Sequence, residues 1–193
     1  LSVMAKGCGV ELSNIGHHRV NKASLISFET VSTPSSSFFG PLFHLSFFHT
    51  AFQVHEMGLL EPLEIDESPD FEDHLSVRLK YNGKTNEQLT RMMLSMAYHS
   101  SAFSDLSPRD LKLLDPVCGR GTTLFEGMIR GFDVYGVDRD KKSIGELDLY
   151  ITRFLKEALF KHKKTSGKVV IDRQNRGEHI EIKYARSKEA FRA

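Results

Sequence analysis

The fold of this chain is decided by residues 111–140, which read LKLLDPVCGRGTTLFEGMIRGFDVYGVDRD. A short apolar run ends in Asp115, two glycines follow, and residues 122–130 have the spacing of a helix closed by Gly131. A second apolar run ends in Asp138. This order predicts one compact βαβ unit with an acid at the end of each strand.

The glycine turn and the second acid indicate a ligand that contains a nucleoside. A helix N-terminus beside glycines lets backbone N–H groups approach a polar or anionic ligand closely. An acid about twenty residues farther along can accept hydrogen bonds from both ribose hydroxyls. The dinucleotide fingerprint G-x-G-x-x-G would require glycine where the chain has Leu124. NAD is therefore disfavoured, and an NAD-dependent oxidoreductase is kept only as an alternative.

The string DPVCGRGTT, followed by the acid of YGVD, resembles the cofactor motifs of class I S-adenosylmethionine-dependent methyltransferases. The resemblance is to the branch that methylates amino groups of RNA or DNA bases, such as tRNA guanosine N-methyltransferases. It implies an α/β, Rossmann-like doubly wound sheet, with S-adenosyl-L-methionine as cofactor. Asp115 would hold the methionine amino group, and Asp138 would accept the ribose hydroxyls. The cofactor-binding residues implied here are Asp115, Pro116, Cys118, Gly119, Gly121, Thr122, Thr123 and Asp138.

A second segment, KTNEQ over residues 84–88, resembles the stretch that precedes those motifs in the same branch. It implies Lys84, Thr85 and Asn86 as further cofactor contacts. The segment also fits a capping box, with Thr85 as the N-cap of a helix, and the two interpretations are compatible. We expect the apolar stripe behind it to be core. The stripe consists of Leu89, Met92, Met93, Met96 and Ala97.

The part that would orient the methyl acceptor has no counterpart in this sequence. In that branch a [Asp/Asn/Ser]-Pro-Pro-[aromatic] loop holds the target base in line with the methyl group. None of the six prolines here is adjacent to another, and none follows residue 116. We therefore assign no catalytic residue, and we expect a fragment, incomplete at its C-terminus and inactive alone. A catalytically inactive S-adenosylmethionine-binding module is the alternative.

Composition limits the class of protein and partner. Residues 151–193 carry 12 Lys and Arg against 5 Asp and Glu, whereas the preceding residues carry 14 against 20. A basic C-terminal part suits RNA or DNA, although a basic solvated face is the commoner interpretation. The two cysteines indicate no disulfide framework, and no targeting or spanning segment is evident, so a cytoplasmic protein without a membrane partner is expected. Cys8 and the pair at 17–18 lack the ligand spacing of a metal site.

The rest of the chain completes the expected organisation. Residues 1–81 form a β-rich region with an acidic connector at 61–73, and residues 82–193 form the Rossmann-like domain. A helix opens with a capping box at 143–146 and runs to about residue 160, its basic C-terminal end extending over 161–164, with a loop at 165–167. The expected strands outside the βαβ unit are 10–15, 24–31, 42–47, 74–81, 169–171 and 179–184. The oligomeric state is left open.

Overall fold

The computed structural model describes residues 1–7, 9–31, 45, 48–63, 71, 74–170 and 176–192. The chain divides into two compact units, each described here by itself. The first contains residues 1–113 and 122–135, and the second contains residues 114–121 and 136–193. Within the described ranges the strands make four separate two-stranded sheets, so the doubly wound sheet stays a prediction.

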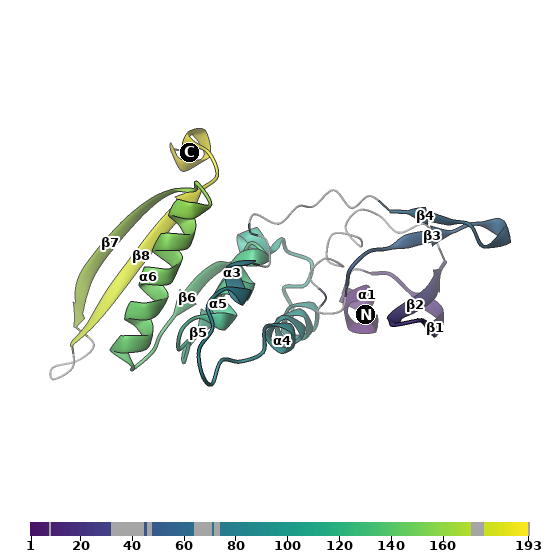
Figure 1. The fold of residues 1–193 in the computed structure, drawn as a ribbon, viewed down its shortest axis with the longest axis horizontal. Helices are drawn as coiled ribbons and strands as arrows, with labels where there is room; N and C mark the ends of the chain where they lie inside the picture. The colour runs from purple at the N-terminus through teal and green to yellow at the C-terminus, as the bar shows by residue number, and fades with distance from the viewer. Residues whose placement is uncertain are drawn as a thin grey trace. The chain divides into compact units, whose positions relative to one another are not determined.

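The expected βαβ unit is confirmed by strand β5 (Lys112–Asp115), helix α5 (Thr122–Ile129) and strand β6 (Asp133–Gly136). β5 and β6 pair with each other. Asp133 N donates to Leu111 O, and Val137 N donates to Asp115 O. Residue numbers rise by four on both segments from the first bond to the second, so the strands are parallel. Figure 1 shows α5 with β5 and β6. A parallel pair needs a crossover between its strands, and α5 supplies it.

Helix α5 is buried in the core of the first unit. Leu124, Phe125, Met128 and Ile129 are buried, and Gly127 lies against the strands. A Cβ at position 127 would lie 2.6 Å from Leu113 Cδ2 and 2.9 Å from Val134 Cγ1. Only glycine therefore lets the helix pack this closely on β5 and β6.

Two predictions about helix α4 (Glu87–His99) are wrong. Its N-cap is Asn86 rather than Thr85, and the Asn86 side chain accepts from Leu89 N at 3.0 Å. The stripe expected to be core is exposed instead, with Leu89, Met92, Met93 and Met96 between 43% and 52% accessible. The face buried instead carries Thr90, Leu94, Ser95 and His99. This face is more polar than the exposed one.

A buried charge network explains why the polar face points inward. Glu126 of α5 is fully buried, and Arg91 of α4 binds both of its carboxylate oxygens, Nε at 3.0 Å and Nη2 at 3.4 Å. Arg130 Nη2 donates to Arg91 O at 2.8 Å and to Ser95 Oγ at 2.5 Å. Burial lowers the pKa of Arg130 to about 10, so its guanidinium stays charged at neutral pH. Buried charges need such partners, and α4 supplies them.

The N-terminal strands match the prediction in part. Helix α1 (Ser2–Gly7) precedes β1 (Leu12–Val20) and β2 (Ala23–Thr30), which pair antiparallel, as do the short strands β3 (Phe52–Val54) and β4 (Leu60–Pro62) on either side of the 3-10 turn η1 (Glu56–Gly58). Ala5 and Leu45 form a small buried cluster. The strand expected at 42–47 and the acidic connector lie almost wholly outside the described residues.

The strand expected at 74–81 is wrong. Helix α3 (His74–Val77) stands there, with Leu75 buried and Val77 exposed. Alternation over so few apolar residues does not distinguish a strand from one helical turn. The 3-10 turn η2 (Pro108–Asp110) then leads into β5.

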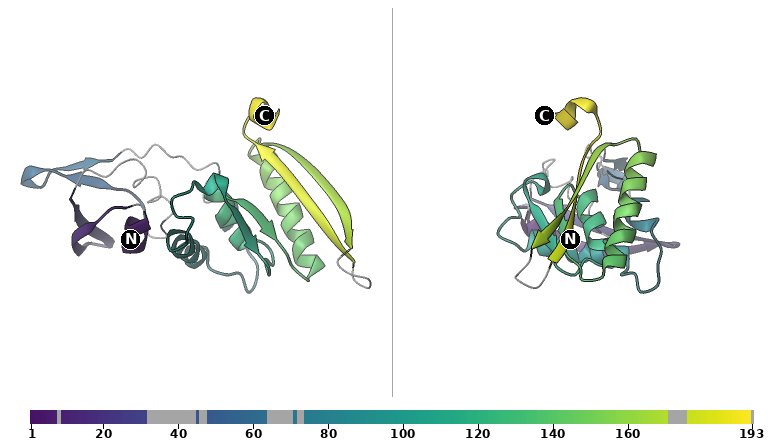
Figure 2. Two further views of the ribbon diagram at one scale, coloured as in Figure 1. Left: turned by 180° about the vertical axis from the view of Figure 1, so that it is seen from behind. Right: turned by 90° about the vertical axis from the view of Figure 1, so that its left-hand side faces the viewer.

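The second unit is a helix laid along a hairpin. Helix α6 (Lys141–Glu157) has Ile151, Phe154 and Leu155 buried, as expected, and Figure 2 shows it beside strands β7 (Lys161–Val170) and β8 (Arg176–Ala185). β7 and β8 pair antiparallel over their whole length, and the short helix α7 (Lys188–Arg192) follows. The N-cap of α6 is Asp140 rather than the predicted Ser143. The loop expected at 165–167 is also wrong, because β7 runs through it.

Among the described residues, none of the helices combines the length and the apolar character that crossing a membrane requires.

Candidate cofactor site

The two strand-end acids and the glycine turn are held together by backbone hydrogen bonds. Val137 N donates to Asp115 O at 2.9 Å, and Cys118 N donates to Val137 O at 2.9 Å. The turn after β5 therefore folds back onto the residue that precedes Asp138. All of these residues belong to the second unit.

Asp138 closes this arrangement with its side chain. Its Oδ2 accepts from Gly119 N at 2.7 Å, and its Oδ1 accepts from Asp140 N at 2.7 Å. These bonds, first that from Asp140 and then that from Gly119, hold the pKa of Asp138 below its ordinary value. The carboxylate is therefore ionised at neutral pH and fixed at the mouth of the glycine turn.

Asp115 uses only one of its carboxylate oxygens to bind the turn. Its Oδ1 accepts from Val117 N at 3.0 Å, which makes a local turn of the kind aspartate favours. Within the described part of the chain no other hydrogen bond to the Asp115 carboxylate is present. Asp115 is half-buried, while Pro116 and Val117 beside it are exposed.

The glycines are required by the backbone conformation of the turn. Gly119 has φ +53° and Gly121 has φ +87°, and Gly121 N donates to Cys118 O at 2.8 Å. Residues with a Cβ rarely adopt such angles. The turn between β5 and α5 therefore depends on both glycines.

The thiol of Cys118 is held in its neutral form. Cys118 is buried, and its pKa is raised to about 11, first by burial and then by the charges of Asp115 and Asp138. At neutral pH the thiol is protonated, so it is not an activated nucleophile. The turn therefore contains an uncharged, buried side chain.

Helix α6 also contacts the glycine turn, through Arg120, and the segment after Asp138, through Asp140. Arg120 of the turn forms an ion pair with Glu146 of α6 at 2.5 Å. Asp140 accepts from Lys142 N, Ser143 N and Ser143 Oγ, which commits it to capping the helix, and the Ser143 hydroxyl is the main reason why its pKa is lowered. The sequence predicted neither the Arg120 pair nor the Asp140 cap. The spacing of Asp140 to Ser143 was a usable signal for the cap.

The other predicted contact residues lie in the first unit, and three of them, Lys84, Asn86 and Thr122, have partners there. Lys84 Nζ donates to Ser76 O at 2.5 Å and pairs with Glu87, and Asn86 caps α4. Thr122, at the start of α5, shares a 3.1 Å hydrogen bond with the hydroxyl of Tyr81. Thr85 is exposed, and Thr123 is half-buried. These contacts hold α3, α4 and α5 together.

No family model, curated protein or solved structure matches this chain significantly. Among the residues that the structure describes, no three His, Cys, Asp or Glu side chains gather as metal ligands would.

The donor set suits a cationic nucleoside better than a pyrophosphate. Asp115 and Asp138 are acids at adjacent strand ends, and the Gly119 amide that a phosphate would seek already donates to Asp138. S-adenosyl-L-methionine carries a sulfonium and an α-ammonium group, both positive, together with ribose hydroxyls that need acceptors. The residues present therefore fit that cofactor.

Proposed function

We propose that this protein binds S-adenosyl-L-methionine and belongs to a methyltransferase that acts on an amino group of a base in RNA or DNA. The observation that carries the proposal is the pair of carboxylates from Asp115 and Asp138 on one glycine turn beside the neutral thiol of Cys118. A negative field at a nucleoside site favours a positively charged cofactor and disfavours NAD, whose pyrophosphate is negative.

Each residue has a distinct part in this proposal. The oxygen of Asp115 that makes no bond to the turn holds the ammonium of the methionine moiety. Asp138 keeps its bonds from Gly119 N and Asp140 N and offers its remaining acceptor positions to the ribose hydroxyls, because an ionised carboxylate has about four such positions. The sulfonium cofactor supplies the methyl group to be transferred. No residue of this chain is assigned to the transfer itself, so the proposal concerns binding and orientation of the donor.

The proposal extends to the setting and the substrate. A cytoplasmic location is proposed because the two cysteines indicate no disulfide framework and Cys118 is a free thiol. A nucleic acid substrate is supported by the excess of 12 Lys and Arg over 5 Asp and Glu in residues 151–193.

Calorimetric titration tests the proposal directly. S-adenosylhomocysteine should release or absorb heat on binding and should raise the melting temperature of the folded chain, whereas NADH should do neither. Gly121→Val should abolish the heat, because a β-branched side chain cannot adopt φ +87° without strain and also blocks backbone approach. Binding of NADH without S-adenosylhomocysteine would instead select an oxidoreductase.

Methyl transfer is tested separately with labelled cofactor and bulk RNA or DNA. The 193 residues alone should show no incorporation, because nothing in the sequence orients an acceptor. Incorporation of label by this chain would contradict that expectation and would place an acceptor site within it.

A further inference from the structure

The β7–β8 hairpin has one face turned toward α6 and one turned away. Lys164 pairs with Asp148 of α6 at 2.5 Å, and Glu178 with Lys141 of α6 at 3.8 Å. Both residues are even-numbered, and in the register Lys164 lies opposite Ile182. Side chains alternate along strands, so the odd-numbered residues form the outer face. The outer face consists of Lys161, Lys163, Thr165, Gly167, Val169, Gly177, His179, Glu181, Lys183 and Ala185.

This outer face carries three lysines, Lys161, Lys163 and Lys183, against one acid, Glu181. Lys163 and Lys183 lie directly opposite one another in the register, an arrangement of like charges that destabilises a sheet. Glu181 lies 3.7 Å from Lys183 and accepts from Thr165 Oγ1 at 3.1 Å. Among the residues that the structure describes, no acid lies within ion-pair distance of Lys161 or Lys163. Folding alone gives no reason for this clustering, whereas a polyanionic partner does.

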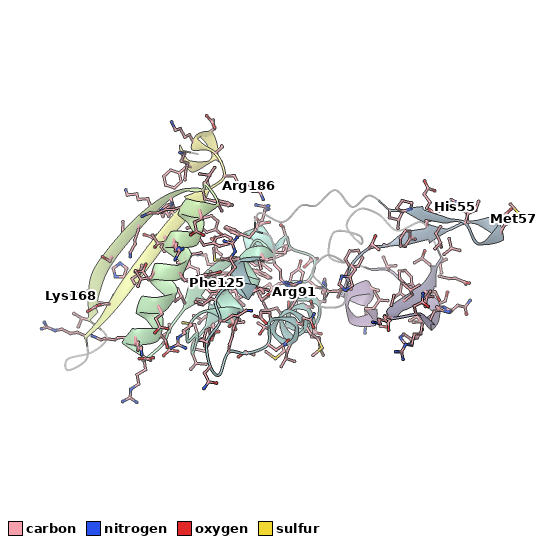
Figure 3. The ribbon with its side chains drawn as sticks, viewed as in Figure 1. His55, Met57, Arg91, Phe125, Lys168 and Arg186 are labelled. Carbon is pink, nitrogen blue, oxygen red and sulfur yellow. The ribbon has the colours of Figure 1, made fainter. Side chains whose placement is uncertain are left out.

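The same face carries a flat ring near the hairpin turn. Gly167 lies opposite His179, and a Cβ at position 167 would lie 2.6 Å from His179 Cε1. The glycine therefore leaves room for the imidazole to lie across the strand. The neighbouring register pair, Lys168 and Glu178, lies on the opposite face of the hairpin, and Figure 3 shows Lys168 at this end of it. Glu178 in turn pairs with Lys141, one residue after the Asp140 cap of the cofactor site.

We propose that the outer face of the β7–β8 hairpin binds a single strand of nucleic acid, with Lys161, Lys163 and Lys183 on its phosphates and the His179 ring stacked on a base. Lysines along a shallow face with a ring that any base can stack on are how proteins bind single strands without sequence preference. A membrane partner is disfavoured because the only large apolar side chain of this face is Val169. The choice of nucleic acid over other polyanions rests on the proposed function.

The test is fluorescence anisotropy of a labelled single-stranded RNA, titrated with the whole chain at several salt concentrations. The triple variant Lys161→Gln, Lys163→Gln, Lys183→Gln should bind more than about tenfold more weakly, and the slope of log affinity against log salt should fall by about 2, since each phosphate contact on a single strand contributes roughly 0.7. The matched control, Lys22→Gln, Lys142→Gln, Lys156→Gln, removes the same charge at exposed positions elsewhere and should bind like wild type.

His179→Ala should weaken binding by at least about fivefold while leaving the salt slope unchanged, since stacking is not electrostatic. Equal binding by the triple variant and its control would overturn the inference. Binding of phosphatidylserine vesicles or polyglutamate through the same lysines, without binding of RNA, would also overturn the inference. S-adenosylhomocysteine titrations on the same proteins separate the two proposals. Failure of cofactor binding with lysine-dependent RNA binding retained would remove only the proposed function, and the reverse would remove only this inference.

Discussion

The carboxylate of Asp138 accepts a hydrogen bond from the backbone amide of Gly119 at 2.7 Å, across a separation of 19 residues. The bond links the end of one strand of the βαβ unit to the turn after the other. The acid expected to hold ribose is therefore already in place before any ligand binds, and its ionisation is favoured by the amides that position it.

Asp138→Asn should weaken S-adenosylhomocysteine binding roughly tenfold, because the amide keeps the size of the side chain but removes the charged acceptor. Calorimetry measures the change. Asp105→Asn, a matched removal of charge at an exposed position, should have no effect. Because the pKa of Asp138 is lowered from 3.8, its contribution should be complete above that pH and lost only as the pH falls through the lowered value. Wild-type affinity in Asp138→Asn would refute the assigned role.

Gly127→Ala should destabilise the chain by about 1 to 3 kcal/mol, because the new methyl group would enter the space of Leu113 and Val134. Gly145→Ala is the control, since no atom lies within 4 Å of a Cβ there and alanine favours the helix; it should gain up to about 1 kcal/mol. Urea unfolding measures both. Combining Gly127→Ala with Leu113→Ala should cost less than the sum of the single changes, and strict additivity would contradict this packing.

Glu126→Gln should destabilise the chain by about 3 to 5 kcal/mol, because it removes the buried charge that partners Arg91. Thermal and chemical unfolding both measure this loss. Glu157→Gln breaks the exposed pair with Arg153 and should change stability little. If the two variants are equally stable, the buried network is not needed for the packing of α4 on α5.

His99 should make stability depend on pH. It is buried in α4, no described residue makes a hydrogen bond to its Nδ1, and burial, followed by the charge of Arg130, lowers its pKa from 6.5 to about 4. The unfolded chain therefore binds more protons between these values, and the free energy of unfolding should fall by up to about 3 kcal/mol as the pH drops from 6.5 to about 4.

The measurement for His99 is urea unfolding across that pH range. His99→Gln should flatten the profile, because glutamine does not titrate there. His179→Ala, which removes an exposed histidine, should keep the wild-type profile. An unchanged slope in His99→Gln would show that other groups cause the dependence.

The βαβ unit was predictable because its signals are local. Apolar runs of strand length, glycines at positions with positive φ, and the helical spacing up to Gly131 all lie within residues 111–140. The two acids of the candidate site followed from the same stretch. The bond between Asp138 and Gly119 did not, because it depends on how the turn folds back.

Two of the errors come from interactions between distant segments. Residues 161–164 were expected to be a basic helix end and 165–167 a loop, with a strand only at 169–171, yet residues 161–170 form one strand because residues 176–185 pair with them. The stripe containing Met92 has helical spacing, but spacing does not say which stripe is buried. The buried carboxylate of Glu126 decides which side of α4 packs inward. It is 35 residues from Arg91 in the sequence, and it needs the side of α4 that carries Arg91 and the hydroxyl groups.

The cap of helix α6 and the acid of the candidate site form one continuous chain of hydrogen bonds. Gly119 N and Asp140 N both donate to Asp138, and Asp140 in turn accepts from Lys142 N and Ser143 N. Fraying of the first helical turn would therefore release the acid, and a ligand that engages the acid would suppress the fraying. Amide hydrogen exchange at Gly119, Lys142 and Ser143 should then slow together when the site is filled, as a single unit of local opening.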